Sequence, residues 1–316
     1  MISIYLYVVM NLITTIAALS ALADATRLRL LAVLGEGSLA VSELVTCLEL
    51  SQPRVSHHLA ILLRCGLVRV RREGVRAYYA RESRGEPVRL ADAAIARLDD
   101  PTVRADRLRA ARLLADRKAE RRGFFATLAR TWPENLAAWI DLDAYRTTVA
   151  ALVPPGGTMA DLGCGSGWLL PTLSAIASRV IGVDHSPEIL DQARQRARDA
   201  GIPGCEFRLG ELEHLPLRER EVDAVFIGLV LHSVPDPQAA LEEAARVCET
   251  GGTLTVIEPL AHHNEHARDE LGGLWMGFSE SEMAQWVASS GFTMLSAETR
   301  TPPAGLGLIA VQARRD

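Results

Sequence analysis

The sequence is poor in cysteine, and its few cysteines show no pairing pattern. Among 316 residues there is no Cys-x-x-Cys, and no histidine stands at ligand spacing from the five thiols, Cys47, Cys65, Cys164, Cys205 and Cys248. Scattered thiols of this kind are typical of a reducing compartment and argue against a structural zinc site. We therefore expect a cytoplasmic protein without a bound metal.

Charge is missing from residues 1–23, a run long enough to raise the question of a membrane-spanning helix. No Lys or Arg cluster flanks the run, and its second half is interrupted by the polar residues Asn11, Thr14, Thr15 and Ser20. The segment also continues without a break into a charged stretch typical of a soluble helix. We therefore expect a buried dimerisation helix and no membrane contact, with Met10 as an alternative start to Met1.

The two signs of charge are unevenly distributed. Residues 1–130 carry 21 Lys and Arg against 13 Asp and Glu, whereas residues 131–316 carry 13 against 26. A positive excess in one part only indicates that this part meets nucleic acid. The chain has no internal repeat, and its length allows two domains, each with its own core.

Helical signals and a hairpin signal fill the first part of the chain. Apolar side chains at helical spacing predict helices at 28–34 and 41–49. A third helix, 51–64, begins with a serine N-cap and a first-turn proline and is ended by a glycine. Alternating residues over 67–80 predict a two-stranded hairpin. This order predicts a winged helix-turn-helix over residues 1–90.

The third helix carries residues suited to reading DNA. Val55, Leu59 and Leu62 share one face, which leaves the other face outward. Gln and Arg can pair with base edges, and Arg on a hairpin can lie along phosphates. We favour DNA binding over a solvated basic face because the capped helix and the wing are adjacent. The candidate DNA contacts are Gln52, Arg54, Ser56, His57, Arg69, Arg71, Arg72 and Arg76.

Residues 22–31, Leu-Ala-Asp-Ala-Thr-Arg-Leu-Arg-Leu-Leu, and residues 51–59, Ser-Gln-Pro-Arg-Val-Ser-His-His-Leu, resemble the ArsR family of dimeric repressors. The resemblance covers roughly residues 16–82 and implies a homodimer that places the third helix in the major groove of an operator. Metal-sensing members carry Cys-Val-Cys where this chain has Ala-Val-Ser at 40–42. Because neither Ala nor Ser supplies a thiolate, we expect no arsenic or zinc sensing at that position.

The second part of the chain changes pattern after a break of two prolines and two glycines at 154–157. Before the break, residues 91–150 are rich in Arg and Ala, which predicts a helical connector. After it, helices at 169–177, 187–200 and 237–247 alternate with strands at 158–162, 180–184, 205–209, 224–227 and 253–257. Two late runs, 293–298 and 306–313, can pair as an antiparallel hairpin at one edge. The fold class is therefore α/β multidomain, with a doubly wound, Rossmann-like domain over residues 151–316.

A glycine-rich segment, Asp-Leu-Gly-Cys-Gly-Ser-Gly at 161–167, ends the first of these strands and opens a helix. Glycines let the backbone turn tightly and approach a ligand with no Cβ in the way. Such a loop is weak evidence by itself, because dinucleotide-binding folds use a similar one. The next strand ends at Asp184, an acid suited to the two hydroxyls of a ribose.

Further segments give the loop its context. The third strand leads to Gly-Glu-Leu at 210–212, and the fourth to Gly-Leu-Val-Leu-His-Ser-Val-Pro-Asp at 228–236. Glu-Ala-Ala-Arg-Val at 243–247 and Gly-Gly-Thr-Leu at 251–254 follow. In order and spacing these segments resemble the class I S-adenosylmethionine-dependent methyltransferases over nearly all of residues 150–316. The resemblance implies binding of S-adenosyl-L-methionine, or of S-adenosyl-L-homocysteine as product or effector.

The same resemblance assigns roles to single residues. The methionine moiety would border Gly163, Gly165, Gly228 and Leu229. The ribose and adenine would meet Asp184, His185, Glu211 and Leu212. Asp161 is expected to organise the loop more than to touch the ligand.

Several side chains allow two interpretations. His232 is a candidate catalytic residue, and it can as well be a packed structural histidine. A late histidine group lacks Cys or carboxylate partners at ligand spacing, so we favour an exposed loop over a metal site at His262, His263 and His266. A pocket roof and a core position are equally open for Trp275, Met276 and Phe278.

The whole order of segments, with Phe124-Phe125 and Thr131-Trp132 in the connector, resembles bacterial ArsR–methyltransferase fusion proteins. The resemblance implies that the connector packs over the cofactor cleft, which makes Trp132 a lining candidate.

Together these features predict a DNA-binding transcriptional regulator, a repressor by the resemblance, with a methyltransferase domain. Methyl transfer is an in-line displacement at a sulfonium and needs no obligatory base. The sequence therefore fits an enzyme acting on a small-molecule acceptor and also a non-catalytic sensor of the cofactor. Arsenite methylation is disfavoured because the domain's three cysteines do not cluster.

Overall fold

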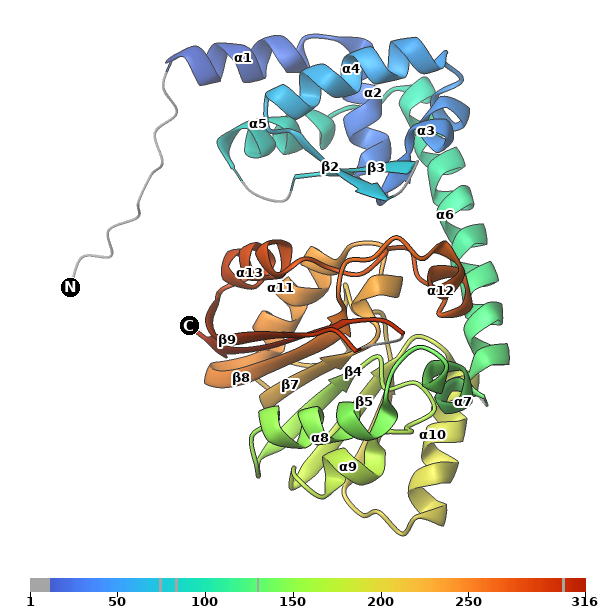
Figure 1. Ribbon diagram of the computed structural model, residues 1–316. Coiled ribbons are helices and arrows are strands. Elements are labelled where there is room, and N and C mark those ends of the chain that lie inside the picture. The colour runs from blue at the N-terminus through green and yellow to red at the C-terminus, as the bar shows by residue number, and fades with distance from the viewer. Residues whose placement is uncertain (1–11, 74–75, 83–84, 130, 303–304) are drawn as a thin grey trace, which may run out of the picture. The chain divides into compact units, whose positions relative to one another are not determined.

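The computed structural model describes residues 12–73, 76–82, 85–129, 131–302 and 305–316, except for the side chains of Arg72, Glu73 and Arg76 (Figure 1). Both alternative starts, Met1 and Met10, lie outside the described residues. The chain divides into two units, Met1–Ala119 and Glu120–Asp316.

The first unit is a winged helix-turn-helix. Its strands, β1 Leu39–Ala40, β2 Val68–Glu73 and β3 Arg76–Arg81, pair antiparallel in the order β1-β3-β2. The helices are α1 Leu12–Leu22, α2 Ala25–Leu34, α3 Val41–Leu48, α4 Gln52–Arg64, α5 Glu86–Ile95 and α6 Pro101–Leu128, of which the last residues belong to the second unit. The predicted order of helices and hairpin is confirmed.

Helix α4 has the predicted inner face, because Val55, Leu59 and Leu62 are each fully buried. Ser51 is its N-cap, yet the serine side chain makes no capping hydrogen bond. Pro53 occupies the first turn and has no N–H, which removes one of the two donors that a cap normally receives.

Helix α1 is covered on one side only. Ala18, Ala21 and Leu22 are buried, whereas apolar side chains on its outer face are more than half exposed, namely Leu12, Ile13, Ile16 and Leu19. Burial of this helix is therefore incomplete within a single chain. Among the described helices, none is both long and apolar enough to cross a membrane.

The second unit is built on a seven-stranded sheet in the order β6-β5-β4-β7-β8-β10-β9 (Figure 1). The strands are β4 Thr158–Leu162, β5 Arg179–Asp184, β6 Cys205–Leu209, β7 Val222–Gly228, β8 Cys248–Pro259, β9 Phe292–Arg300 and β10 Leu308–Arg315. The first five of these run parallel, and β10 lies antiparallel between β8 and β9. The predicted α/β sheet with an antiparallel hairpin at its edge is confirmed.

The helices that follow α6 are α7 Trp132–Ala137, α8 Leu142–Leu152, α9 Leu170–Ser174, α10 Pro187–Asp199, α11 Pro237–Val247, α12 Glu265–Glu270 and α13 Glu280–Ser289, with a short 3-10 turn, η1, at Leu231–Ser233. Of these, α9, α10 and α11 connect parallel strands. Helix α9 is shorter than the predicted 169–177, and β8 begins five residues before the predicted 253.

The strand order fixes where a ligand can bind. Strand β4 is followed in sequence by β5 on one side, and the chain later returns to its other side as β7. In open parallel sheets the crevice lies outside the carboxyl ends of the strands where this reversal occurs. The glycine-rich segment after β4 lies at this position.

Candidate functional site

The loop after β4 carries three glycines in the left-handed conformation, with φ of 75° at Gly163, 54° at Gly165 and 72° at Gly167. A Cβ on Gly163 would lie 2.5 Å from the side chain of Val230, so close packing requires glycine there. A Cβ on Gly165 would meet no atom within 4 Å. The backbone at Gly165 therefore borders free space that a ligand can occupy.

Asp184 ends β5 beside this loop. Its Oδ2 accepts the backbone N–H of Gly165 at 3.1 Å, and its Oδ1 accepts that of Ser186 at 3.1 Å. The Nδ1 of His185 lies 3.3 Å from the same Oδ1. Burial raises the pKa of the Asp184 carboxyl, while His185 and the backbone donors act in the opposite direction. The structure thus brings together two residues that are nineteen positions apart in sequence.

Asp161 is buried at the end of β4. Burial, and then the charge of Asp184, raise the pKa of its carboxyl from 3.8 to about 7. Its role as an organiser of the loop stays a prediction.

Residues assigned to the adenine meet the last turns of α6. The rings of His185 and Phe125 pack edge to face with centroids 6.1 Å apart. The carboxylate of Glu211 lies 3.9 Å from the guanidinium of Arg122, and Leu212 is buried. The resemblance to the fusion proteins implied a connector over the cofactor cleft, yet it gave no site role to Phe125 or Arg122.

The segment after β7 is bent at Leu229, a non-glycine residue with φ 56°. Its N–H donates to the carbonyl of Ile257 on β8 at 2.9 Å. A left-handed leucine costs free energy and persists only where its surroundings fix it. The bend turns the next backbone N–H groups toward Glu258.

Glu258 is fully buried at the end of β8 and holds this segment. Its Oε1 accepts the N–H of Val230 and of Leu231, each at 2.7 Å, and its Oε2 lies 2.9 Å from Nδ1 of His232. His232 is therefore a packed, anchored histidine, although its Nε2 has no hydrogen-bond partner among the described residues. Sequence reasoning missed Glu258, whose signal is an acid directly after the apolar run of β8.

The remaining apolar candidates are core residues. Trp275, Met276 and Phe278 are buried, and Nε1 of Trp275 donates to the carbonyl of Val234 at 2.6 Å. Trp132 is half-buried against the core of the second unit, and its contact with a cofactor stays a prediction.

The late histidines do not form a simple exposed loop. His262 is half-buried, and its Nδ1 accepts the N–H of Asn264 at 3.1 Å. His266 lies in α12, 3.2 Å from Glu270, and only His263 has the expected loop exposure. Across the described ranges, no group of three or more His, Cys, Asp or Glu side chains could hold a metal ion.

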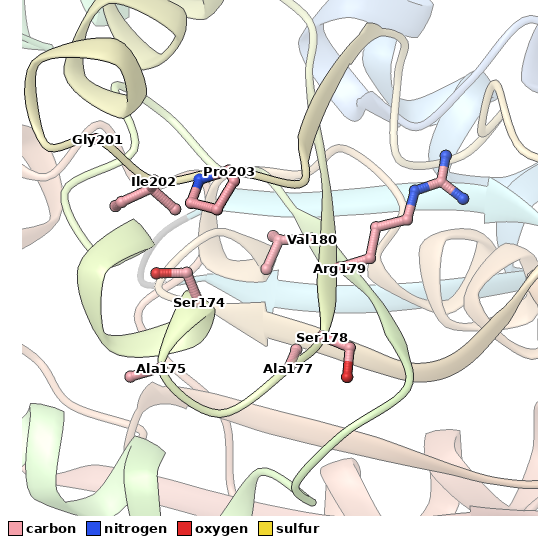
Figure 2. Close-up of a pocket in the computed structure, with 9 residues that line it drawn as sticks. All are labelled: Ser174, Ala175, Ala177, Ser178, Arg179, Val180, Gly201, Ile202 and Pro203. Atoms are coloured by element: carbon pink, nitrogen blue, oxygen red, sulfur yellow. The ribbon is translucent and has the colours of Figure 1, made fainter.

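A pocket lies at the other end of the strands (Figure 2). It is lined at the amino ends of β5 and β6 by Ser174, Ala175, Ala177, Ser178, Arg179, Val180, Gly201, Ile202 and Pro203. Ligands of open parallel sheets bind at the carboxyl ends. We therefore place the candidate site at the glycine loop and not in this pocket.

The DNA candidates on α4 are exposed, as the helical pattern predicts for Gln52, Arg54, Ser56 and His57. Arg54 also donates to the hydroxyl of Thr26 on α2 at 3.1 Å. On the hairpin, Arg69 donates to the carbonyl of Arg81 at 2.7 Å, so part of its hydrogen bonding is used within the wing. Arg71 is half-buried on the same strand. The side chains of Arg72 and Arg76 lie outside the described part of the structure.

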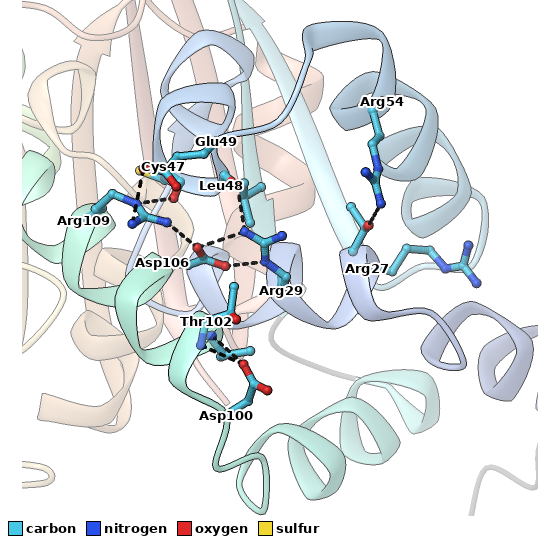
Figure 3. Close-up of polar contacts among 12 residues, drawn as sticks. Arg27, Arg29, Cys47, Leu48, Glu49, Arg54, Asp100, Thr102, Asp106 and Arg109 are labelled. Carbon is cyan, nitrogen blue, oxygen red and sulfur yellow. Dashed lines mark hydrogen bonds and ion pairs between the residues drawn. The ribbon is translucent and has the colours of Figure 1, made fainter.

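A buried charge cluster braces the helix-turn-helix from α6 (Figure 3). Asp106 is fully buried and accepts from Nε of Arg29 at 2.6 Å and from Nη2 of Arg109 at 2.6 Å. The two arginines also donate to the carbonyls of Leu48 and Cys47 at the end of α3, each at 2.7 Å. This cluster fixes the end of α3, directly before the turn into α4.

The sheet order and the glycine loop at its carboxyl edge define the second unit as a class I methyltransferase fold. Family models agree: residues 160–256 match the methyltransferase domain, and residues 24–70 match the bacterial regulatory protein, arsR family. The chain therefore joins an ArsR-type helix-turn-helix to a methyltransferase domain.

Two relatives resemble this chain in sequence over about a third of its length. An uncharacterized 37.1 kDa protein in transposon TN4556 of Streptomyces fradiae is 44% identical over 108 residues, which are 33% of this chain and 31% of that protein. An arsenite methyltransferase of Halobacterium salinarum is 34% identical over 111 residues, 34% of this chain and 28% of that protein. The chain thus spans about a third of the length of these relatives.

Among solved structures, a candidate methyltransferase in complex with a Haloferax volcanii methyltransferase activator has a TM-score of 0.51 and 22% identity. The match covers 60% of this chain and 96% of that one, and it shows the fold.

Proposed function

We propose that this protein is a DNA-binding transcriptional regulator whose methyltransferase domain binds S-adenosylmethionine and methylates a small molecule. The observation that carries the proposal is the open space at Gly165 with the Asp184 carboxylate beside it. The free backbone admits a ligand closely, and the carboxylate oxygens can accept hydrogen bonds from two adjacent ribose hydroxyls.

The charges around the site suit a cationic methyl donor. Asp161, Asp184 and Glu258 all stand at the carboxyl ends of strands in the same sheet. A sulfonium among these acidic groups is attracted electrostatically, and apolar neighbours such as Leu212 and Leu229 exclude water. Methyl transfer then depends on alignment of donor and acceptor more than on a base. His232, held by Glu258, stays a candidate for proton removal from the acceptor.

Arsenite is an unsuitable acceptor for this site. Burial raises the pKa of Cys164 well above its ordinary value and that of Cys248 to about 12, so neither forms a thiolate near neutral pH. Cys205 is half-buried, and burial raises its pKa as well. The three cysteines of the methyltransferase domain therefore give no support to the activity that is named for the Halobacterium relative.

A second role, sensing of the cofactor, is supported by α6. This helix gives Asp106 and Arg109 to the cluster that braces the helix-turn-helix, and it gives Arg122 and Phe125 to the neighbourhood of Glu211 and His185. A ligand bound beside Glu211 and His185 would therefore lie next to residues that contact Arg122 and Phe125 of α6. S-adenosylmethionine or S-adenosylhomocysteine could then change operator affinity, provided that the two DNA-binding states differ in ligand affinity.

Homodimer formation is part of the proposal. The exposed apolar residues of α1, Leu12, Ile13, Ile16 and Leu19, form a face that a second copy could cover.

Calorimetry of the full chain with S-adenosylmethionine and S-adenosylhomocysteine tests cofactor binding. We expect saturable binding of both, lost in Asp184→Ala and retained in the exposed control Asp199→Ala. Absence of binding by the unmutated protein would overturn the proposal.

Turnover and sensing need separate measurements. Label transfer from methyl-deuterated S-adenosylmethionine into a small-molecule extract would support the enzyme. Operator affinity is measured by fluorescence anisotropy at fixed salt, on DNA selected by the protein from a random pool. Equal affinity with and without saturating S-adenosylhomocysteine would remove the sensor role.

A further inference from the structure

Tyr145 on α8 is a fully buried tyrosine whose hydroxyl has no hydrogen-bond partner among the described residues. Buried tyrosine hydroxyls nearly always find a partner, because an unpaired buried donor loses its hydrogen bonds to water without replacement. The described structure therefore offers no hydrogen-bond partner for the hydroxyl, although the aromatic ring has a packing partner. The ring packs on Trp168, directly after the glycine loop, with centroids 5.6 Å apart and planes inclined by 31°.

The hydroxyl reaches the carboxyl edge of the sheet. A Cβ on Gly228, the last residue of β7, would clash with the tyrosine oxygen and with the ring of Phe226, so the hydroxyl and this ring share the room that glycine leaves. Burial raises the pKa of Tyr145, and the charges of Glu258 and Asp161 raise it further. Glu258 lies at the carboxyl end of β8, and Asp161 lies at that of β4. The hydroxyl thus lies among the ends of three neighbouring strands.

Other unpartnered atoms occur at the same edge. Oγ of Ser166, inside the glycine loop, and Nε2 of His232, after β7, are both buried and lack partners among the described residues. Three unsatisfied polar atoms from separate segments at one sheet edge indicate a surface that is completed by a bound polar ligand.

The parts of the cofactor differ in the number of protein side chains that are available to bind them. The ribose has Asp184, and the adenine has His185, Glu211 and Leu212, in the function proposed above. The amino-acid end carries an ammonium and a carboxylate, yet the residues assigned to it, such as Gly163 and Gly228, offer mainly backbone. A tyrosine hydroxyl can donate to the carboxylate or accept from the ammonium.

We propose that the Tyr145 hydroxyl hydrogen-bonds the amino-acid end of bound S-adenosylmethionine and S-adenosylhomocysteine. This inference rests on the proposed function. Glycine at 228 leaves room for the hydroxyl beside the Phe226 ring, and Trp168 packs on the tyrosine ring and holds it in position.

The test compares two ligands and two variants of the full chain by calorimetry. S-adenosylhomocysteine carries the amino-acid end, whereas 5′-methylthioadenosine lacks it and keeps the adenine, ribose and sulfur. Tyr145→Phe removes only the hydroxyl, and Tyr79→Phe makes the same change on β3 of the first unit as a control. A hydrogen bond to a charged group corresponds to roughly a 10-fold or greater change in affinity.

We expect Tyr145→Phe to bind S-adenosylhomocysteine about 10-fold more weakly and methylthioadenosine unchanged. The ligand-free variant should melt no lower than the unmutated protein, because the hydroxyl has no acceptor to lose. Tyr79→Phe should leave both affinities unchanged.

Three results would overturn the inference while the proposed function stands. They are equal S-adenosylhomocysteine affinity in Tyr145→Phe, an equal loss for both ligands, or a lower melting temperature of the ligand-free variant. Failure of the unmutated protein to bind either ligand would overturn the proposed function and this inference together.

Discussion

His232 and Glu258 form a buried pair at the carboxyl edge of the sheet, with Nδ1 and Oε2 2.9 Å apart. The same carboxylate accepts the N–H groups of Val230 and Leu231. One side chain of β8 therefore sets the course of the chain after β7, including the strained Leu229.

Replacement of Glu258 should destabilise the second unit. In Glu258→Gln an NH2 group replaces one acceptor oxygen and leaves buried donors unpaired, so we expect the free energy of unfolding to fall by about 3 kcal/mol. Urea denaturation measures the change. The control, Glu298→Gln on the exposed part of β9, should stay within about 0.5 kcal/mol of the unmutated protein. A Glu258→Gln value equal to the control would contradict this account of the loop.

Asp161 should make stability depend on pH. Its carboxyl has a pKa of about 7 when folded and an ordinary value of 3.8, so between these values the folded chain holds a proton that the unfolded chain has released. The contribution of this group to stability therefore falls as pH rises from about 4 to about 7 and then levels off.

The variant Asp161→Asn removes this titration. Relative to the unmutated protein, its free energy of unfolding should rise by on the order of 2–4 kcal/mol between about pH 4.5 and about pH 7.5. Urea denaturation at several pH values gives both curves. Parallel curves would show that the carboxyl titrates normally.

Asp106 should stabilise the helix-turn-helix specifically. Asp106→Asn leaves the guanidinium groups of Arg29 and Arg109 without their buried carboxylate, with a loss of about 3 kcal/mol. We expect faster hydrogen–deuterium exchange in α3 and α4, because the arginines also hold the last carbonyls of α3. Asp116→Asn, on the exposed side of α6, is the matched control. Unchanged exchange in Asp106→Asn would exclude a bracing role.

Gln52 should contribute to sequence discrimination. It is exposed at the first residue of α4, where a glutamine can pair with a base edge. Gln52→Ala should weaken binding to the selected DNA roughly 10-fold, and leave the salt dependence unchanged since no charge is removed. Anisotropy titrations at several salt concentrations separate the two effects, with Gln238→Ala of the second unit as control. An equal loss of affinity for the selected DNA and for unrelated DNA would assign Gln52 to the backbone instead.

Much of the architecture could be predicted from local sequence. The inner face of α4 follows from apolar residues three and four positions apart, and the parallel strands follow from short apolar runs between helical patterns. These signals are local, since they depend on residues within one element. The glycine loop and Asp184 were recognisable because each directly follows a strand.

The remaining features depend on contacts between distant segments. Glu258 and His232 are 26 residues apart, and Asp106 and Arg29 are 77 apart. Tyr145 reaches Gly228 only because α8 packs beside the end of β7.

Periodicity and turn residues act locally, so the amino-acid sequence alone predicts a basic helix-turn-helix followed by an α/β domain with a glycine loop. Which polar atoms find hydrogen-bond partners depends instead on the tertiary structure. Burial removes water from a hydroxyl or a carboxyl, and whether a partner replaces that water depends on segments that the chain brings together only when it folds.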